Sequence, residues 1–159
     1  INQSIYLIRH ALAPGNGDPI NFELLDCSTQ RNLNDVGILQ SKEIGQFFSK
    51  NNIKIDDVFS SQWCRCKDTA KYAFGDFKEF SALNSTYTPP YDQNEKHQIK
   101  ELKKYVSSWK GDGGNLVLVT HYVIILAITG ETTRSGELVI TDKNFTIECK
   151  AFIFIFYSV

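Results

Sequence analysis

The feature that most constrains the fold is a continuous apolar run, rich in Val and Leu, at residues 116–120. A strand that is apolar on both faces is typical of the centre of a parallel sheet covered by helices on both sides. Shorter apolar runs at 5–8 and 58–59 predict two further strands, and we expect the last strands at 137–140 and 146–157. In the final run, every second residue is aromatic: Phe152, Phe154 and Phe156.

Segments with helical character lie between these strands. A helix capped by Asn34 is predicted to run to about residue 50, and Gly75 and Gly130 are predicted to end two others. The expected helices are 34–50, 62–74, 95–109 and 122–129. The alternation predicts an α/β fold, a three-layer sandwich with a mostly parallel central sheet flanked by helices. Such sheets bind ligands beyond the carboxyl ends of their strands.

Length and composition favour a single globular domain over 1–159, with a short lid-like excursion at about 81–94 around Pro89-Pro90. A net charge of -1 argues against a nucleic-acid partner. The longest apolar run, 116–130, is too short and too polar for a transmembrane segment. We expect a monomer or a weak dimer. The sequence begins at Ile1 and contains no Met, so a processed or trimmed start is expected, which slightly favours an exported or periplasmic protein over a cytoplasmic one.

The four cysteines are too few for a disulfide scaffold: Cys27, Cys64, Cys66 and Cys149. The Cys64-x-Cys66 spacing does not suit a zinc knuckle, so no metal site is expected. Buried free thiols are the favoured interpretation, and a disulfide between Cys27 and one of the pair is the alternative.

Charged and nucleophilic side chains gather at the predicted strand ends. His10 directly follows one strand and His121 another, Arg9 lies beside His10, and Arg65 begins a helix after a third strand. A helix start offers free N–H groups and partial positive charge. Arginine can hold two phosphate oxygens at once. These groups together predict an anion pocket with a nucleophilic histidine inside it.

The motifs that carry these residues resemble the histidine phosphatase superfamily, which has the phosphoglycerate mutase-like fold. The matching pieces are Leu7-Ile8-Arg9-His10-Ala11, Leu33-Asn34-x-x-Gly37-x-x-Gln40, Ser60-Ser61-x-x-x-Arg65-Cys66-x-x-Thr69-Ala70 and Val119-Thr120-His121. They occur in the family's order, and the length resembles its small members.

The resemblance implies a metal-independent phosphatase without a cofactor. His10 is expected to take the phosphoryl group as phosphohistidine, with Arg9, Arg65 and His121 around the oxygens. The substrate class is a phosphorylated small molecule or a phosphoprotein, as a phosphomonoester or a phosphoramidate. Asn16 and Arg31 are weaker candidates for substrate binding.

Two positions depart from the family pattern. Ala11 replaces the usual Gly, and Asn84 stands where many members carry a carboxylic acid that protonates the leaving group. Glu137 is our substitute candidate for that acid, ahead of Asp18 and Asp26. A site without an acid favours substrates that have good leaving groups, such as aryl phosphates or phosphoramidates.

Other functions remain as alternatives. A catalytically weak pseudo-phosphatase would keep the pocket to bind phosphate or a phosphoprotein. A mutase is disfavoured, because the 81–94 excursion is short for enclosing a bis-phosphorylated substrate.

Overall fold

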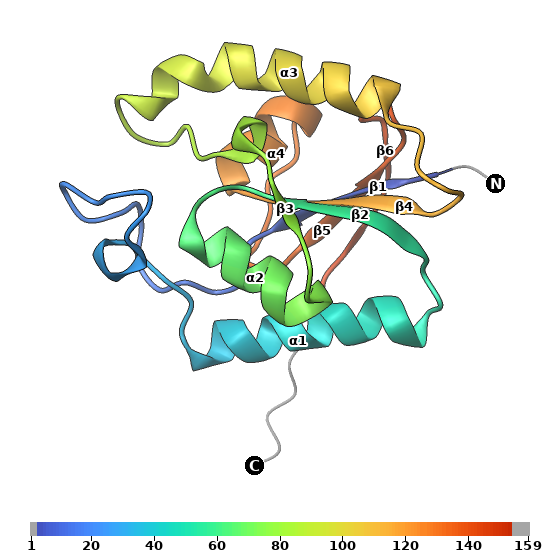
Figure 1. Ribbon diagram of the computed structural model, residues 1–159, viewed down its shortest axis with the longest axis horizontal. Helices are drawn as coiled ribbons and strands as arrows, with labels where there is room; N and C mark the ends of the chain where they lie inside the picture. The colour runs from blue at the N-terminus through green and yellow to red at the C-terminus, as the bar shows by residue number, and fades with distance from the viewer. Residues whose placement is uncertain (1–2, 154–159) are drawn as a thin grey trace.

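The computed structural model describes residues 3–153 and contains a six-stranded mixed sheet with the strand order β3-β2-β4-β1-β5-β6 (Figure 1). Strands β1, β2, β3 and β4 are mutually parallel along this order, whereas β5 runs antiparallel to β1 and β6 antiparallel to β5. This confirms the expected α/β fold with a mostly parallel sheet.

The strands are β1 (Ile5–Arg9), β2 (Ile55–Ser60), β3 (Lys78–Glu79), β4 (Asn115–Thr120), β5 (Leu138–Thr141) and β6 (Ile147–Ala151). The α-helices are α1 (Asp35–Lys50), α2 (Cys64–Phe74), α3 (Glu95–Ser108) and α4 (Tyr122–Thr129). Three short 3-10 helices are η1 (Cys27–Thr29), η2 (Ser81–Leu83) and η3 (Tyr91–Asn94).

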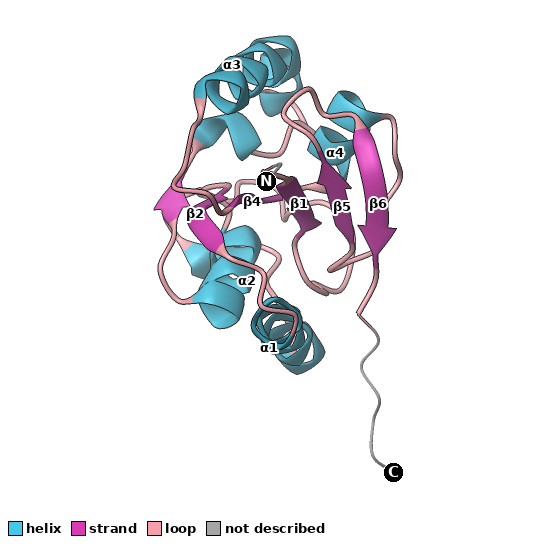
Figure 2. Ribbon diagram, turned by 90° about the vertical axis from the view of Figure 1, so that its right-hand side faces the viewer, coloured by secondary structure: helices cyan, strands magenta, loops and turns pink. Residues whose placement is uncertain are grey.

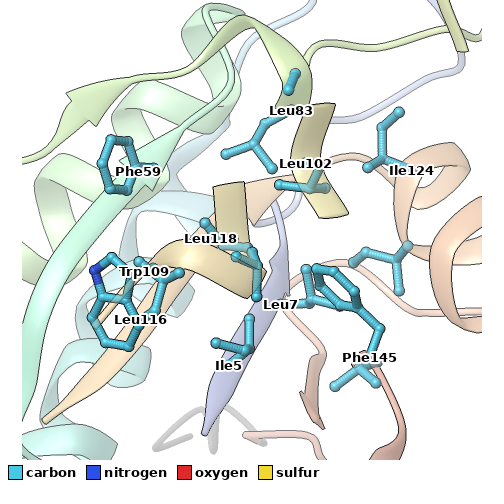
Figure 3. Packing of buried hydrophobic residues seen from close by; sticks show 14 residues of the cluster. Ile5, Leu7, Phe59, Leu83, Leu102, Trp109, Leu116, Leu118, Ile124 and Phe145 are labelled. Carbon is cyan, nitrogen blue, oxygen red and sulfur yellow. The ribbon is translucent and has the colours of Figure 1, made fainter. Parts of the chain in front are cut away.

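Helices cover both faces of the sheet, with α1 and α2 on one side and α3 and α4 on the other (Figure 2). Alternate side chains of β4 explain this layering: Leu116 and Leu118 join the core under α3 and α4, and Val117 and Val119 join the core under α1 and α2. Figure 3 shows the first core, which includes Leu118 of β4 and Leu102 of α3. The double burial of β4 is what its unbroken apolar sequence predicted.

Most expected boundaries are confirmed, and the differences have local causes. Asn34 caps α1 by accepting a hydrogen bond from the Gly37 N–H. Helix α2 begins at Cys64 rather than residue 62, because Trp63 has extended backbone. Strand β6 ends at Ala151, so the predicted aromatic alternation does not hold at Phe152, and positions 154 and 156 lie outside the described residues. The two-residue β3 was not predicted.

The cysteines behave differently from the favoured expectation. Cys27 and Cys64 form a disulfide that ties the first long loop to the start of α2. Cys66 is a buried free thiol, as expected, whereas the free Cys149 is exposed. Burial raises the pKa of the Cys66 thiol to about 12, so it stays protonated.

The segment 81–94 is partly built into the body of the molecule. Its first half is buried, including Leu83 and Asn84, and Tyr87 is exposed. Within residues 3–153, no helix is long and apolar enough to cross a membrane.

Candidate active site

His10 and His121 lie side by side because the strands that precede them pair in parallel register. Arg9 of β1 pairs with Thr120 of β4, and the residue that follows each strand is a histidine. The His10 N–H donates to the Thr120 carbonyl at 3.0 Å, which fixes this strand end. The imidazole centroids are 5.6 Å apart, and both side chains are buried.

The hydrogen bonds of the His10 ring leave Nε2 as its unprotonated nitrogen. Its Nδ1 lies 2.8 Å from the Ala11 carbonyl oxygen, which can only accept a hydrogen bond, so Nδ1 carries the proton. Nε2 then presents its lone pair and receives a 3.3 Å contact from Arg65 Nε–H. The Ala11 N–H in turn donates to Thr69 of α2 at 3.0 Å. Ala11 fits this position without disturbing the ring.

Arg65 lies in the first turn of α2 and is almost completely buried. Its Nη1 forms a 2.8 Å ion pair with Asp18 Oδ1, and the other Asp18 oxygen accepts from the Trp63 indole N–H at 3.0 Å. Burial opposes ionisation of Asp18, but the Arg65 charge and the hydrogen bonds from Arg65, the Arg31 N–H and the Trp63 indole together outweigh it and lower the pKa of the carboxyl. Asp18 is therefore an ionised partner of Arg65, not a proton donor at neutral pH.

Two further arginines complete a strongly cationic pocket. Arg9 donates through Nη1 to the Thr133 carbonyl, and its Nε is buried without a hydrogen-bond partner in the described part of the chain. Arg31 is held by the Gly17 and Ala13 carbonyls. The cavity has a volume of about 290 Å³. Its lining includes Arg9, His10, Asn16, Asp18, Arg31, Arg65, Ser85, Tyr87, Thr88, His121 and Tyr122.

The pocket keeps its two histidines neutral. Burial lowers the pKa of His10 well below its usual range, and the Arg65 charge lowers it further. Burial and the Arg65 charge likewise lower the pKa of His121 well below its usual range. A neutral His10 is the form that can act as a nucleophile, and the positive charge in the pocket resides on the arginines.

The structure brings together the expected residues Arg9, His10, Arg65 and His121, and it also places Asn16 and Arg31 in the same lining. Glu137 is not among them. Its carboxylate accepts from the Arg134 N–H at 2.7 Å and pairs with Lys150 at 3.6 Å.

The Glu137 carboxyl is held in its ionised form. Burial opposes that form, but the hydrogen bonds from Arg134 and the charges of Lys150 and Arg134 together outweigh it and lower the pKa of Glu137. The geometry therefore gives no support to Glu137 as the general acid. Asp26 caps η1 on an exposed loop and does not line the pocket either.

Several residues of the site were not foreseen. Ser85, Tyr87 and Thr88 reach the pocket from the 81–94 segment, and no periodicity or motif in that polar stretch marked them. The pairing of Asp18 with Arg65 was also missed, because the two are 47 residues apart and join through a loop. Within residues 3–153, no group of three or more His, Cys, Asp or Glu could hold a metal ion.

Comparison with known proteins identifies the family. The family profile of the histidine phosphatase superfamily (branch 1) matches residues 5–84, which carry His10 and Arg65. The chain belongs to this superfamily. Membership supports a phosphatase- or mutase-type enzyme, as the cationic pocket does. No curated protein sequence matches the chain.

Several solved structures share the fold at low sequence identity. A protein assigned as the phosphohistidine phosphatase SixA from Agrobacterium tumefaciens superposes with a TM-score of 0.64 at 18% identity, covering 96% of this chain and 100% of that one. The protein histidine phosphatase SixA complexed with tungstate gives 0.62 at 12%, covering 93% and 96%. A phosphoglycerate mutase from Thermus thermophilus gives 0.67 at 17%, covering 95% and 99%.

Proposed function

We propose that this histidine phosphatase superfamily member is a metal-independent phosphatase that hydrolyses a phosphomonoester or a phosphoramidate through a phosphohistidine on His10. The observation that carries the proposal is the His10 ring itself. Nδ1 donates to the Ala11 carbonyl at 2.8 Å, and the unprotonated Nε2 receives a contact from Arg65 Nε–H at 3.3 Å. A neutral nucleophile next to fixed positive charge is what phosphoryl transfer requires.

The reaction would proceed in two displacements. His10 Nε2 forms a bond to phosphorus while the bond to the leaving group breaks, and the leaving group takes that electron pair. Water then attacks phosphorus, the electron pair of the breaking N–P bond returns to Nε2, a proton of the water passes to solvent, and inorganic phosphate leaves. Arg9, Arg31 and Arg65 would offset the charge of the phosphoryl oxygens, and His121 lines the same pocket.

The leaving-group side of the pocket favours substrates that need little acid catalysis. Of the described carboxylates, the one that lines the pocket is Asp18, and it is ionised against Arg65. Asn84 is an amide, and Glu137 pairs elsewhere. General acid catalysis contributes about 10²–10⁴-fold, so alkyl phosphates should react slowly. A phosphoramidate suits the site better, and two of the similar structures are proteins called phosphohistidine or protein histidine phosphatases.

Hydrolysis of an aryl phosphate tests the proposal. The wild-type protein should turn over without added metal and in the presence of a chelator, and His10→Ala should abolish turnover. His97→Ala is the matched control, because that imidazole is exposed on α3 and pairs with Glu101 at the surface. Equal activity of wild type and His10→Ala would refute the phosphohistidine mechanism. Phosphate binding by a wild-type protein that shows no turnover would favour the pseudo-phosphatase instead.

A further inference from the structure

His121 is connected to Asn84 through the hydroxyl of Ser61. His121 Nε2 lies 2.8 Å from Ser61 Oγ, and Ser61 Oγ lies 3.3 Å from Asn84 Oδ1. All three side chains are buried. Asn84 thus occupies the expected acid position, but it contacts the second histidine indirectly and has no proton to give.

The Asn84 amide has one possible orientation. Oδ1 accepts from the Gln62 backbone N–H at 2.8 Å, and a backbone N–H can only donate. On the other side, Nδ2 donates to Gln62 Oε1 at 2.8 Å. Because Oδ1 faces Ser61 as an acceptor, the Ser61 hydroxyl must donate its single proton to Asn84.

That assignment fixes the proton on His121. With its own proton directed at Asn84, Ser61 Oγ can only accept from its other neighbours, which are the Trp63 N–H at 3.2 Å, the Cys66 thiol and His121 Nε2 at 2.8 Å. His121 Nε2 therefore carries the ring proton. The Cys66 thiol, 3.4 Å from Nε2, lies within reach of the Thr120 carbonyl as its own acceptor at 3.6 Å.

The other ring nitrogen, Nδ1, is left for the ligand. Among the described residues it makes no hydrogen bond, and it is not one of the fully buried unpaired atoms, so it is open to the pocket that the ring lines. In the neutral ring it is a base. The titratable and charged groups around it are Arg9, His10, Arg31, Arg65 and Cys66.

We propose that Asn84, acting through Ser61, is a positioning residue that holds His121 with basic Nδ1 toward the phosphoryl group, so that the pocket takes up one proton with each dianion it binds. The proton comes from solvent or from a monoanionic phosphate, and it forms an N–H bond at Nδ1 that donates to a phosphoryl oxygen. A carboxylate at position 84 in place of the amide could itself titrate, whereas the amide cannot. This inference rests on the proposed function, because it assigns the phosphoryl group to this pocket.

Sulfate binding tests the proposal without catalysis. Sulfate keeps its two charges across the neutral range, so a proton taken up on binding belongs to the protein. Calorimetric titrations at several pH values should show affinity falling about tenfold per pH unit above neutrality. In protein labelled with ¹⁵N-histidine, His121 Nε2 should be protonated in the free state, and Nδ1 should gain a proton when sulfate binds. His97→Gln simplifies the spectra.

Variants at position 84 separate positioning from packing. Asn84→Leu keeps the side-chain volume but removes the oxygen that accepts from Ser61. Sulfate affinity should then depend less on pH, and His121 should populate both tautomers. Asn84→Asp keeps an acceptor for Ser61, and the partly buried Gln62 amide can turn to meet it, so this variant should restore the single His121 tautomer seen in the wild type. Ser61→Ala removes the hydroxyl that connects Asn84 to His121, and this variant replaces Asn84→Leu in the test if Asn84→Leu does not fold.

The outcomes distinguish this inference from the proposed function. Sulfate binding that leaves Nδ1 unprotonated, or Asn84→Leu behaving as wild type, would overturn the role of Asn84 alone. Failure of the wild-type protein to bind sulfate at all would contradict the anion pocket, and with it both proposals.

Discussion

The two sides of the pocket are built in different ways. On the strand side, His10 and His121 follow paired residues of adjacent parallel strands, and backbone hydrogen bonds fix both positions. On the loop side, Asp18 and Arg31 come from a long exposed loop that side-chain contacts and one disulfide hold in place.

This difference separates two tasks. Groups for phosphoryl transfer must keep fixed mutual positions, and a sheet end provides them because the register cannot slip without moving every side chain. Groups that select the leaving group sit on loops, which can change without disturbing the core. Changes on the strand side should therefore decide whether the protein catalyses the reaction at all. Changes on the loop side should alter the rate and the choice of substrate.

Loss of Arg65 should have the largest effect, because this side chain joins the two sides by contacting both His10 and Asp18. We expect Arg65→Ala to lower kcat/KM for an aryl phosphate by about 10²-fold or more, as for removal of a transition-state donor. Lys67→Ala is the control, since that amine lies on the same helix and pairs with Glu79. A loss below about threefold would show that Arg65 does not contact the phosphoryl group.

Removal of the Cys27–Cys64 disulfide tests how far the position of the loop side depends on this covalent bond. The Cys27→Ser/Cys64→Ser double variant should lower the free energy of unfolding by about 2–4 kcal/mol, because the reduced chain regains loop entropy. KM should rise more than kcat falls, since the strand side stays intact. Denaturant unfolding and steady-state kinetics measure both, with Cys149→Ser as the exposed control. Unchanged stability would show that the tie does not hold the loop.

Asp18→Asn should have an intermediate effect. Asparagine can still accept from the Trp63 indole but no longer neutralises Arg65, so the guanidinium loses its alignment beside His10. We expect kcat to fall about tenfold with little increase in KM. Asp26→Asn, on the same loop, should behave as wild type. An unchanged kcat would mean that Arg65 is positioned without Asp18.

Glu137→Gln should have the smallest effect, less than about twofold in kcat/KM on aryl and alkyl phosphates alike. Its carboxylate pairs with Arg134 and Lys150 and does not line the pocket. Parallel assays on the two substrate classes measure this. A large defect confined to alkyl phosphates would instead restore Glu137 as the general acid.

The same contrast explains what could be predicted from the sequence. The strand side was predictable, because an apolar run followed by His10 or His121 specifies both the element and the end at which its side chain lies. The loop side was not, since the contact of Asp18 with Arg65 and the Cys27–Cys64 pairing depend on how the long first loop folds back over α2. Glu137 was proposed from its place after Ser135-Gly136, which does not show that Lys150 lies beside it or that the pocket lining excludes it.

The most direct test of the central claim is to trap the reaction intermediate. The protein should be mixed with an aryl phosphate or acetyl phosphate, quenched in base and analysed by peptide mass spectrometry, with His10→Ala and His97→Ala in parallel. The account predicts a phosphoryl group on His10 that survives base, is lost in acid and is absent from His10→Ala alone. Turnover without a label on His10, or a label on another residue, would contradict it.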